Sequence, residues 1–194
     1  MHDALDTSAA PVIFSHSAAR AIGHHPRNVP DSVLERLPAN GGVVMVPFVP
    51  AFINDAAWQA SARYDVYEAG LEAMNPGDPE GVAAAMNAWN AATPRPVTTI
   101  AMVADHLDHI ARIAGHDHVG IGGDLDGTLY TVQGLDSVDD YPALFIELAR
   151  RGWSDDQLAR LAGGNVLRVM RQAEAVAAAM ADRPPSLEKS ETND

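Results

Sequence analysis

Three short apolar runs stand between longer segments of helical pattern. They cover residues 11–15, 43–48 and 118–122. Each run is too brief for a helix, and short apolar runs bounded by turn residues are typical of buried strands. Because such strands alternate with helices along this chain, the pattern predicts an α/β fold with parallel strands.

The helical segments have recognisable ends. Pro30 and Asp31 favour a helix that runs to about Leu37, because proline is favoured in a first turn. Helical pattern is expected over 55–92, where the sequence at 75–79 breaks it into two helices, and over 98–114 and 141–152. A capping box at Ser154–Gln157 starts a further helical segment that continues to about 181, with a break at 163–165. Within 55–74, apolar side chains recur at spacings of three, four and seven, which predicts a packing face; they are Trp58, Tyr64, Tyr67, Leu71 and Met74.

The third apolar run breaks into glycines and two carboxylates. Its sequence, from Val119 to Gly127, is VGIGGDLDG. Glycines at a strand end allow close approach of backbone and ligand, and the residue after them is presented at the carboxyl edge of the sheet. Asp124 is therefore a candidate catalytic residue, because catalytic groups of α/β barrels lie at this edge. Alternatively, the stretch is a glycine-rich turn in which Asp126 caps the next helix.

The first apolar run also ends on a polar side chain, in the order Ser15, His16, Ser17. A neutral imidazole at that position can bind zinc, and it can equally be a hydrogen-bonded strand end. In the following loop Arg27 is either a surface charge or a guanidinium that binds a substrate carboxylate through two hydrogen bonds. The neighbouring pair His24 and His25 is expected to be exposed to solvent.

A second histidine pair occurs inside the helical segment 98–114. His106 and His109 are three residues apart, so they lie on one helix face and could share a metal ion. The alternatives are a histidine buried against the sheet and an Asp–His pair on the solvent side.

The composition of the chain disfavours or excludes several classes of partner and site. The 194 residues carry a net charge of −13, which disfavours nucleic acid as a partner because its phosphates would be repelled. There is no cysteine, so disulfides, thiolate metal sites and a cysteine nucleophile are excluded. No stretch approaches the length of a membrane span.

Four motifs together resemble the membrane dipeptidase (renal dipeptidase, peptidase M19) family. They are PVIFSHS at 11–17, HPRNVPD at 25–31, ADHLDHI at 104–110 and HVGIGGDLDG at 118–127. The resemblance implies a (β/α)8 barrel that binds two zinc ions and hydrolyses dipeptides. It also implies that His16 is a ligand of the second zinc, that Arg27 holds the dipeptide's terminal carboxylate, and that Asp124 contacts substrate and handles the proton.

The family's other metal ligands precede its counterpart of His16, and none has an equivalent here. We therefore expect the C-terminal half of such an enzyme, with the last three barrel strands in a domain at 2–181, a helical insertion at 55–96 and a polar tail at 182–194. Such a chain is expected to be inactive alone. It is also expected to self-associate or form a homo-oligomer through its open strand edges. A non-catalytic remnant or binding module of the same fold is the alternative. The sequence leaves the compartment undetermined.

Overall fold

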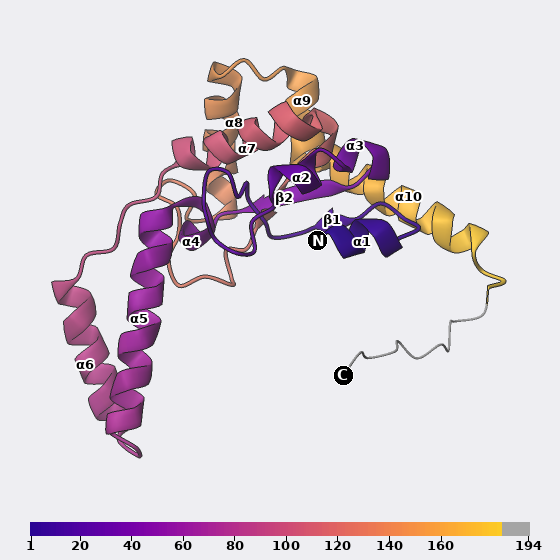
Figure 1. The fold of residues 1–194 in the computed structure, drawn as a ribbon. Helices are drawn as coiled ribbons and strands as arrows, with labels where there is room; N and C mark the ends of the chain where they lie inside the picture. The colour runs from indigo at the N-terminus through magenta and orange to yellow at the C-terminus, as the bar shows by residue number, and fades with distance from the viewer. Residues whose placement is uncertain (184–194) are drawn as a thin grey trace.

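A three-stranded parallel sheet lies at the centre of the computed structural model, which describes residues 1–183 (Figure 1). The strands are β1 (Ile13–Phe14), β2 (Val43–Pro47) and β3 (Val119–Gly123), in the spatial order β1-β2-β3. Both pairings are parallel. The expected α/β architecture is confirmed.

The strand boundaries differ by a few residues from the sequence expectation. β1 is shorter than 11–15, although hydrogen bonds continue beyond it: Val43 N–H donates to the Val12 carbonyl (3.0 Å) and Ser17 N–H to the Met45 carbonyl (3.1 Å). The ladder between β2 and β3 shifts register between Val46 and Pro47. Pro47 has no N–H to donate, so the end of β2 is where its presence harms the ladder least.

Helices cover one face of the sheet. Val44, Val46 and Val119 are fully buried and belong to a core that includes Leu34 and Leu107. These side chains come from β2, β3, α2 (Asp31–Leu34) and α7 (Ile100–Ala114). The helix expected from 31 to 37 is in fact two, α2 and α3 (Leu37–Asn40). Pro38 explains the break, because it lacks an N–H and is tolerated only in the first turn of a helix.

The C-terminal part of the chain follows the predicted helix ends closely. The elements are η2 (Val138–Asp140), α8 (Tyr141–Arg150), α9 (Asp155–Ala159), η3 (Arg160–Gly164) and α10 (Asn165–Ala179). Ser154 and Gln157 form the expected capping box at the start of α9. The predicted interruption occurs at Gly163, whose backbone leaves the helical region. Of the tail expected at 182–194, residues 184–194 lie outside the described part of the chain.

The remaining helices are α1 (His2–Thr7), α4 (Pro50–Ile53), α5 (Asp55–Met74) and α6 (Pro79–Ala92), with a short turn η1 (His116–His118) before β3. α5 and α6 form a hairpin that projects away from the sheet (Figure 1). Tyr64 and Tyr67 of α5 pack on Trp89 of α6, with ring centroids 5.8 and 5.6 Å apart. The expectation of a packing face along all of α5 was wrong at its far end, because Met74 is 73% exposed where the hairpin leaves the core. None of the helices in the described residues is long and apolar enough to cross a membrane.

Candidate functional site

His16 and Asp124 meet at the carboxyl edge of the sheet. The distance from His16 Nε2 to Asp124 Oδ1 is 4.0 Å, and the side chains are 37% and 29% exposed. His16 Nδ1 is hydrogen-bonded to the Ser15 hydroxyl at 2.9 Å. The Nε2 atom therefore remains directed toward the carboxylate and solvent.

Glycines at the end of β3 make this approach possible. A Cβ on Gly122 would lie 2.5 Å from the Ser15 carbonyl oxygen, so a side chain there would push the end of β1 away from β3. Gly123 and Asp124 both have positive φ, 63° and 68°. A positive φ is uncommon for a residue with a side chain, and it turns the Asp124 carboxylate out of the strand direction.

Buried Asn28 holds the loop that carries Arg27. Its side chain accepts from Ala18 N–H (2.9 Å) and donates to the carbonyls of Gly23 and Phe52, both at 2.8 Å. The Arg27 guanidinium lies over the Phe52 ring, 5.0 Å from its centroid. Arg27 is exposed and thus available to a ligand, but its side chain is braced against an aromatic wall.

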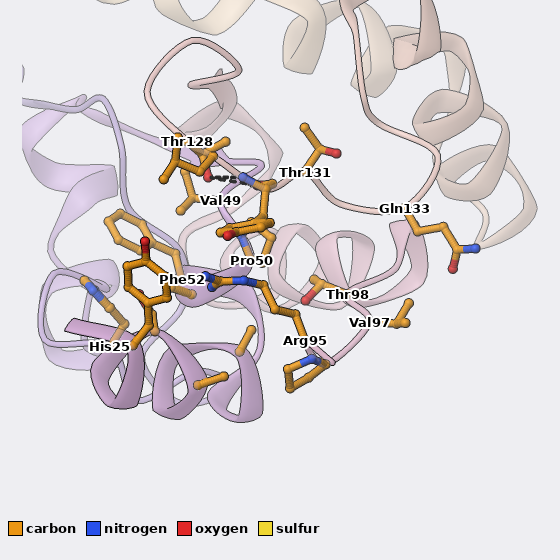
Figure 2. A pocket seen from close by; sticks show the side chains of 18 of the residues that line it. His25, Val49, Pro50, Phe52, Arg95, Val97, Thr98, Thr128, Thr131 and Gln133 are labelled. Carbon is orange, nitrogen blue, oxygen red and sulfur yellow. Dashed lines mark hydrogen bonds between the residues drawn. The ribbon is translucent and has the colours of Figure 1, made fainter. Parts of the chain in front are cut away.

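A pocket of about 750 Å³ opens beside these residues (Figure 2). Its walls come from the segment after β2, from α5, from the linker that follows α6 and from the loop after β3. His16, Arg27 and Asp124 do not line it, but Phe52 and Gly127 do. Because Arg27 packs on Phe52 and the Asp124 carboxylate lies against Gly127, the pocket adjoins Arg27 and Asp124. His16 lies on the far side of Asp124, with Nε2 4.0 Å from Oδ1.

The two loop histidines differ in environment. His24 is exposed and pairs with Asp55 (Nδ1 to Oδ2, 2.5 Å), and this contact helps to hold the pKa of Asp55 below its usual value. His25 is half-buried, with its ring centroid 4.1 Å from that of Phe52. Burial and the charges of Arg27 and Arg20 lower the pKa of His25. The expectation of an exposed pair was thus wrong for His25, which lines the pocket.

His106 and His109 do not form a metal site. His106 is fully buried; its Nδ1 accepts from Ala19 N–H and its Nε2–H donates to the Ile53 carbonyl, both at 3.0 Å. Both nitrogens are therefore occupied by backbone groups. His109 Nε2 instead contacts Asp31 Oδ1 at 2.7 Å. His106 is therefore the buried histidine of the first alternative, and His109 forms the Asp–His pair of the second.

The two carboxylates of the motif at 104–110, Asp105 and Asp108, also have structural roles. Arg151 contacts Asp105 (2.7 Å) and Asp108 (2.8 Å), and Trp153 Nε1–H donates to Asp108 (2.7 Å). These contacts fasten α8 and the turn after it to α7. The motif at 104–110 therefore holds the framework of the site together.

The donor set at the sheet edge is too small for a complete metal centre. His16 and Asp124 offer one nitrogen and one carboxylate, whereas a zinc ion in a catalytic site needs about three protein ligands. Within residues 1–183, no three histidine, aspartate or glutamate side chains form a group that could hold a metal ion. The residues present do not fit a full two-zinc site.

The sequence of residues 1–184 matches the family described as membrane dipeptidase (peptidase family M19). The chain belongs to this family. It is 41% identical, over 90% of its length, to an uncharacterised dipeptidase of Schizosaccharomyces pombe, and 38% identical, over 97%, to the dipeptidase tcpJ of Claviceps purpurea. The chain spans only 34% and 35% of these two relatives.

Solved structures agree with the fold. A probable dipeptidase, PvdM from Pseudomonas aeruginosa, has a TM-score of 0.69 at 28% identity, covering 90% of this chain and 48% of that one. A Rhodobacter sphaeroides metallo peptidase, solved with a phosphinate mimic of the dipeptide L-Ala-D-Ala, has a TM-score of 0.64 at 24% identity, covering 88% of this chain and 38% of that one. The membrane dipeptidase resemblance of the four motifs is confirmed.

Sequence reasoning missed the residues that build the pocket. Arg95 follows the α6 helix between two prolines, and Tyr130 lies in the loop after Asp124. Neither residue belongs to an apolar period or to one of the four motifs. The only signal was the unusual Pro-Arg-Pro sequence at 94–96, which marks a rigid linker.

Proposed function

We propose that this chain contributes to a zinc-dependent dipeptidase site, with Arg27 binding the substrate carboxylate, Asp124 handling the proton and His16 binding metal. The observation that carries the proposal is the 4.0 Å approach of His16 Nε2 to Asp124 Oδ1 at the carboxyl edge of the sheet, in a chain of the membrane dipeptidase family. The dipeptidase names of the relatives and the metallo peptidase description of a solved structure with the same fold support the reaction class.

Each side chain has a role that its surroundings support. Arg27 is exposed and braced on Phe52, so its guanidinium can take a carboxylate through two parallel hydrogen bonds. This requirement favours dipeptides over longer chains, whose terminal carboxylate would lie too far from the scissile bond. Asp124 can take a proton and return it to the leaving amine nitrogen, provided that the substrate lies within hydrogen-bond reach.

We further propose that two zinc ions serve the complete enzyme, as the family resemblance implies. Zinc ions held there would supply a coordinated water of lowered pKa and so a hydroxide nucleophile near neutral pH. His16 Nε2 is suited to one ion because the Ser15 hydroxyl occupies Nδ1. The remaining ligands would come from outside the described residues.

Reconstitution tests this function. The chain would be refolded with the segment that precedes the matching region of the Schizosaccharomyces pombe dipeptidase, then assayed with zinc and a dipeptide. We expect hydrolysis, a loss of about 100-fold or more in kcat for Asp124→Asn, and a raised KM for Arg27→Gln. Arg63→Gln, an exposed arginine on α5, is the matched control. Hydrolysis that is indifferent to Asp124 would exclude the assigned role.

A non-catalytic binding module of the same fold is the second candidate. It is favoured by the small donor set, since one histidine and one aspartate cannot hold a pair of ions. This candidate predicts that the reconstituted protein binds dipeptide through Arg27 but does not hydrolyse it. The same assay therefore separates the two functions.

We also propose that the chain self-associates through its strand edges. In the described residues β1 and β3 each pair only with β2, so both have a free edge, and Ile13 on β1 is 38% exposed. We expect sizing to give species larger than the 20.6 kDa chain. Ile13→Lys should increase the monomer fraction. The control Ile146→Lys, at an exposed position of α8 away from the strand edges, should not. A monomeric wild type with a sharp cooperative melt would contradict the proposal.

A further inference from the structure

Arg95 occupies the middle of the pocket between two aromatic rings. Its guanidinium carbon lies 3.4 Å from the ring centroid of Tyr130 and 4.9 Å from that of Tyr64. A separation of 3.4 Å is van der Waals contact, which a planar guanidinium reaches only when it lies nearly flat on the ring. Figure 2 shows the Arg95 side chain extending from its linker into the pocket, toward the side where His25 and Phe52 lie.

Stacking leaves the in-plane donors of this guanidinium available. A flat guanidinium uses its face on the ring, while its five N–H groups point outward in its own plane. Within the described residues Arg95 forms neither an ion pair nor a side-chain hydrogen bond, and the two carboxylates that line the pocket, Asp65 and Asp136, are not paired with it. A partly buried cation with unused donors is a binding site for an anion.

The linker that carries Arg95 is held by hydrogen bonds at Val97 and Thr98, just after the arginine. The Asn54 side-chain amide donates to the Val97 carbonyl (3.2 Å) and to the Thr98 hydroxyl (3.3 Å). Gln133 N–H donates to the Thr98 carbonyl (2.8 Å). The guanidinium is therefore held in position before a ligand arrives, which reduces the entropic cost of binding.

The pocket joins this cation to the proposed reaction site. Phe52 lies beneath Arg27 at one wall, and Gly127, against which the Asp124 carboxylate lies, forms another part of the lining. If Arg27 takes the terminal carboxylate that every dipeptide has, Arg95 remains for a second negative group. A side-chain carboxylate is the second negative group that a dipeptide can carry.

We propose that Arg95 is a specificity-determining residue that binds the side-chain carboxylate of an acidic dipeptide, with Tyr64 and Tyr130 holding its guanidinium flat. This inference rests on the proposed dipeptidase function. It identifies the substrate class as dipeptides that contain aspartate or glutamate. A purely structural role, in which Arg95 only joins the α5–α6 hairpin to the loop at 127–136, makes different predictions.

Binding is measured on the full chain by ligand-observed NMR, without any need for turnover. The probes are L-Ala-L-Ala, L-Glu-L-Ala and L-Ala-L-Glu. We expect one or both acidic probes to bind about tenfold more tightly than L-Ala-L-Ala, because a charge-assisted hydrogen bond is added. Arg95→Gln should abolish the difference and leave L-Ala-L-Ala binding unchanged. Arg95→Lys, which keeps the charge but not the planar fork, should restore only part of it. Arg27→Gln should weaken all three probes.

Three results would overturn the assignment. They are equal binding of acidic and neutral probes by the wild type, equal weakening of all probes by Arg95→Gln, and a lowered melting temperature of Arg95→Gln with unchanged discrimination. Hydrolysis by the reconstituted protein is assayed separately. Tenfold discrimination in binding without hydrolysis would contradict the dipeptidase function and support carboxylate binding by Arg95. Hydrolysis without a preference for acidic dipeptides would overturn only the role of Arg95.

Discussion

The purified chain, incubated with excess zinc and a dipeptide, should show negligible hydrolysis. Removing a single group that orients a metal ligand typically costs 10–100-fold in affinity or activity. Here the described residues supply one histidine and one aspartate at the sheet edge, without a carboxylate to bridge two cations. A lone ion on His16 would neither place the nucleophile nor hold it against the scissile carbonyl.

His16→Ala is the control for this experiment, because any zinc-dependent rate that arises at the proposed site must disappear with the imidazole. A contaminating peptidase would leave the two rates equal. Turnover that requires zinc and is lost in His16→Ala would contradict the prediction. It would mean that a second polypeptide or another copy of the chain completes the metal site.

Sequence pattern predicted the sheet and the convergence of the site because both depend on local signals. Apolar runs located the strands. His16 and Asp124 each follow one of these runs, and the carboxyl ends of parallel strands share an edge, which is where both residues lie. The capping box at Ser154 and the break at Gly163 were equally local. The second short helix, α3, was not predicted, because Pro38 was expected to end a single helix and instead occupies the first turn of a new one.

The pocket could not be predicted because its walls are far apart in sequence. Tyr64, Arg95 and Tyr130 come from three separate segments and meet only through the path of the α5–α6 hairpin. His25 was assigned to solvent for a related reason, since its partner Phe52 lies in the segment after a different strand. The exposure of Met74 likewise reflects tertiary arrangement, because an apolar helix face is buried only when another element covers it.

His106→Ala should destabilise the fold by about 4 kcal/mol. The substitution leaves the Ala19 N–H and the Ile53 carbonyl without partners, each at a cost of about 1–3 kcal/mol, and opens a cavity in a fully buried position. His106→Gln retains one acceptor and one donor on a side chain of similar length. Its loss of stability, measured by urea denaturation, should be clearly smaller than that of His106→Ala.

The same histidine should make stability depend on pH. Burial lowers the pKa of His106 below its usual 6.5, so between the two values the unfolded chain binds the proton more readily than the folded chain. Its contribution to stability is therefore complete above pH 6.5 and is lost as the pH falls toward the pKa of the folded state. His25, whose pKa is also lowered, acts in the same range, whereas Asp55 acts only below its usual 3.8. The free energy of unfolding is measured against pH for the wild type and for His106→Gln, and the difference between the two curves isolates the His106 contribution. Parallel curves between pH 7 and 5 would show that protonation of this imidazole is not coupled to unfolding, and would contradict the prediction.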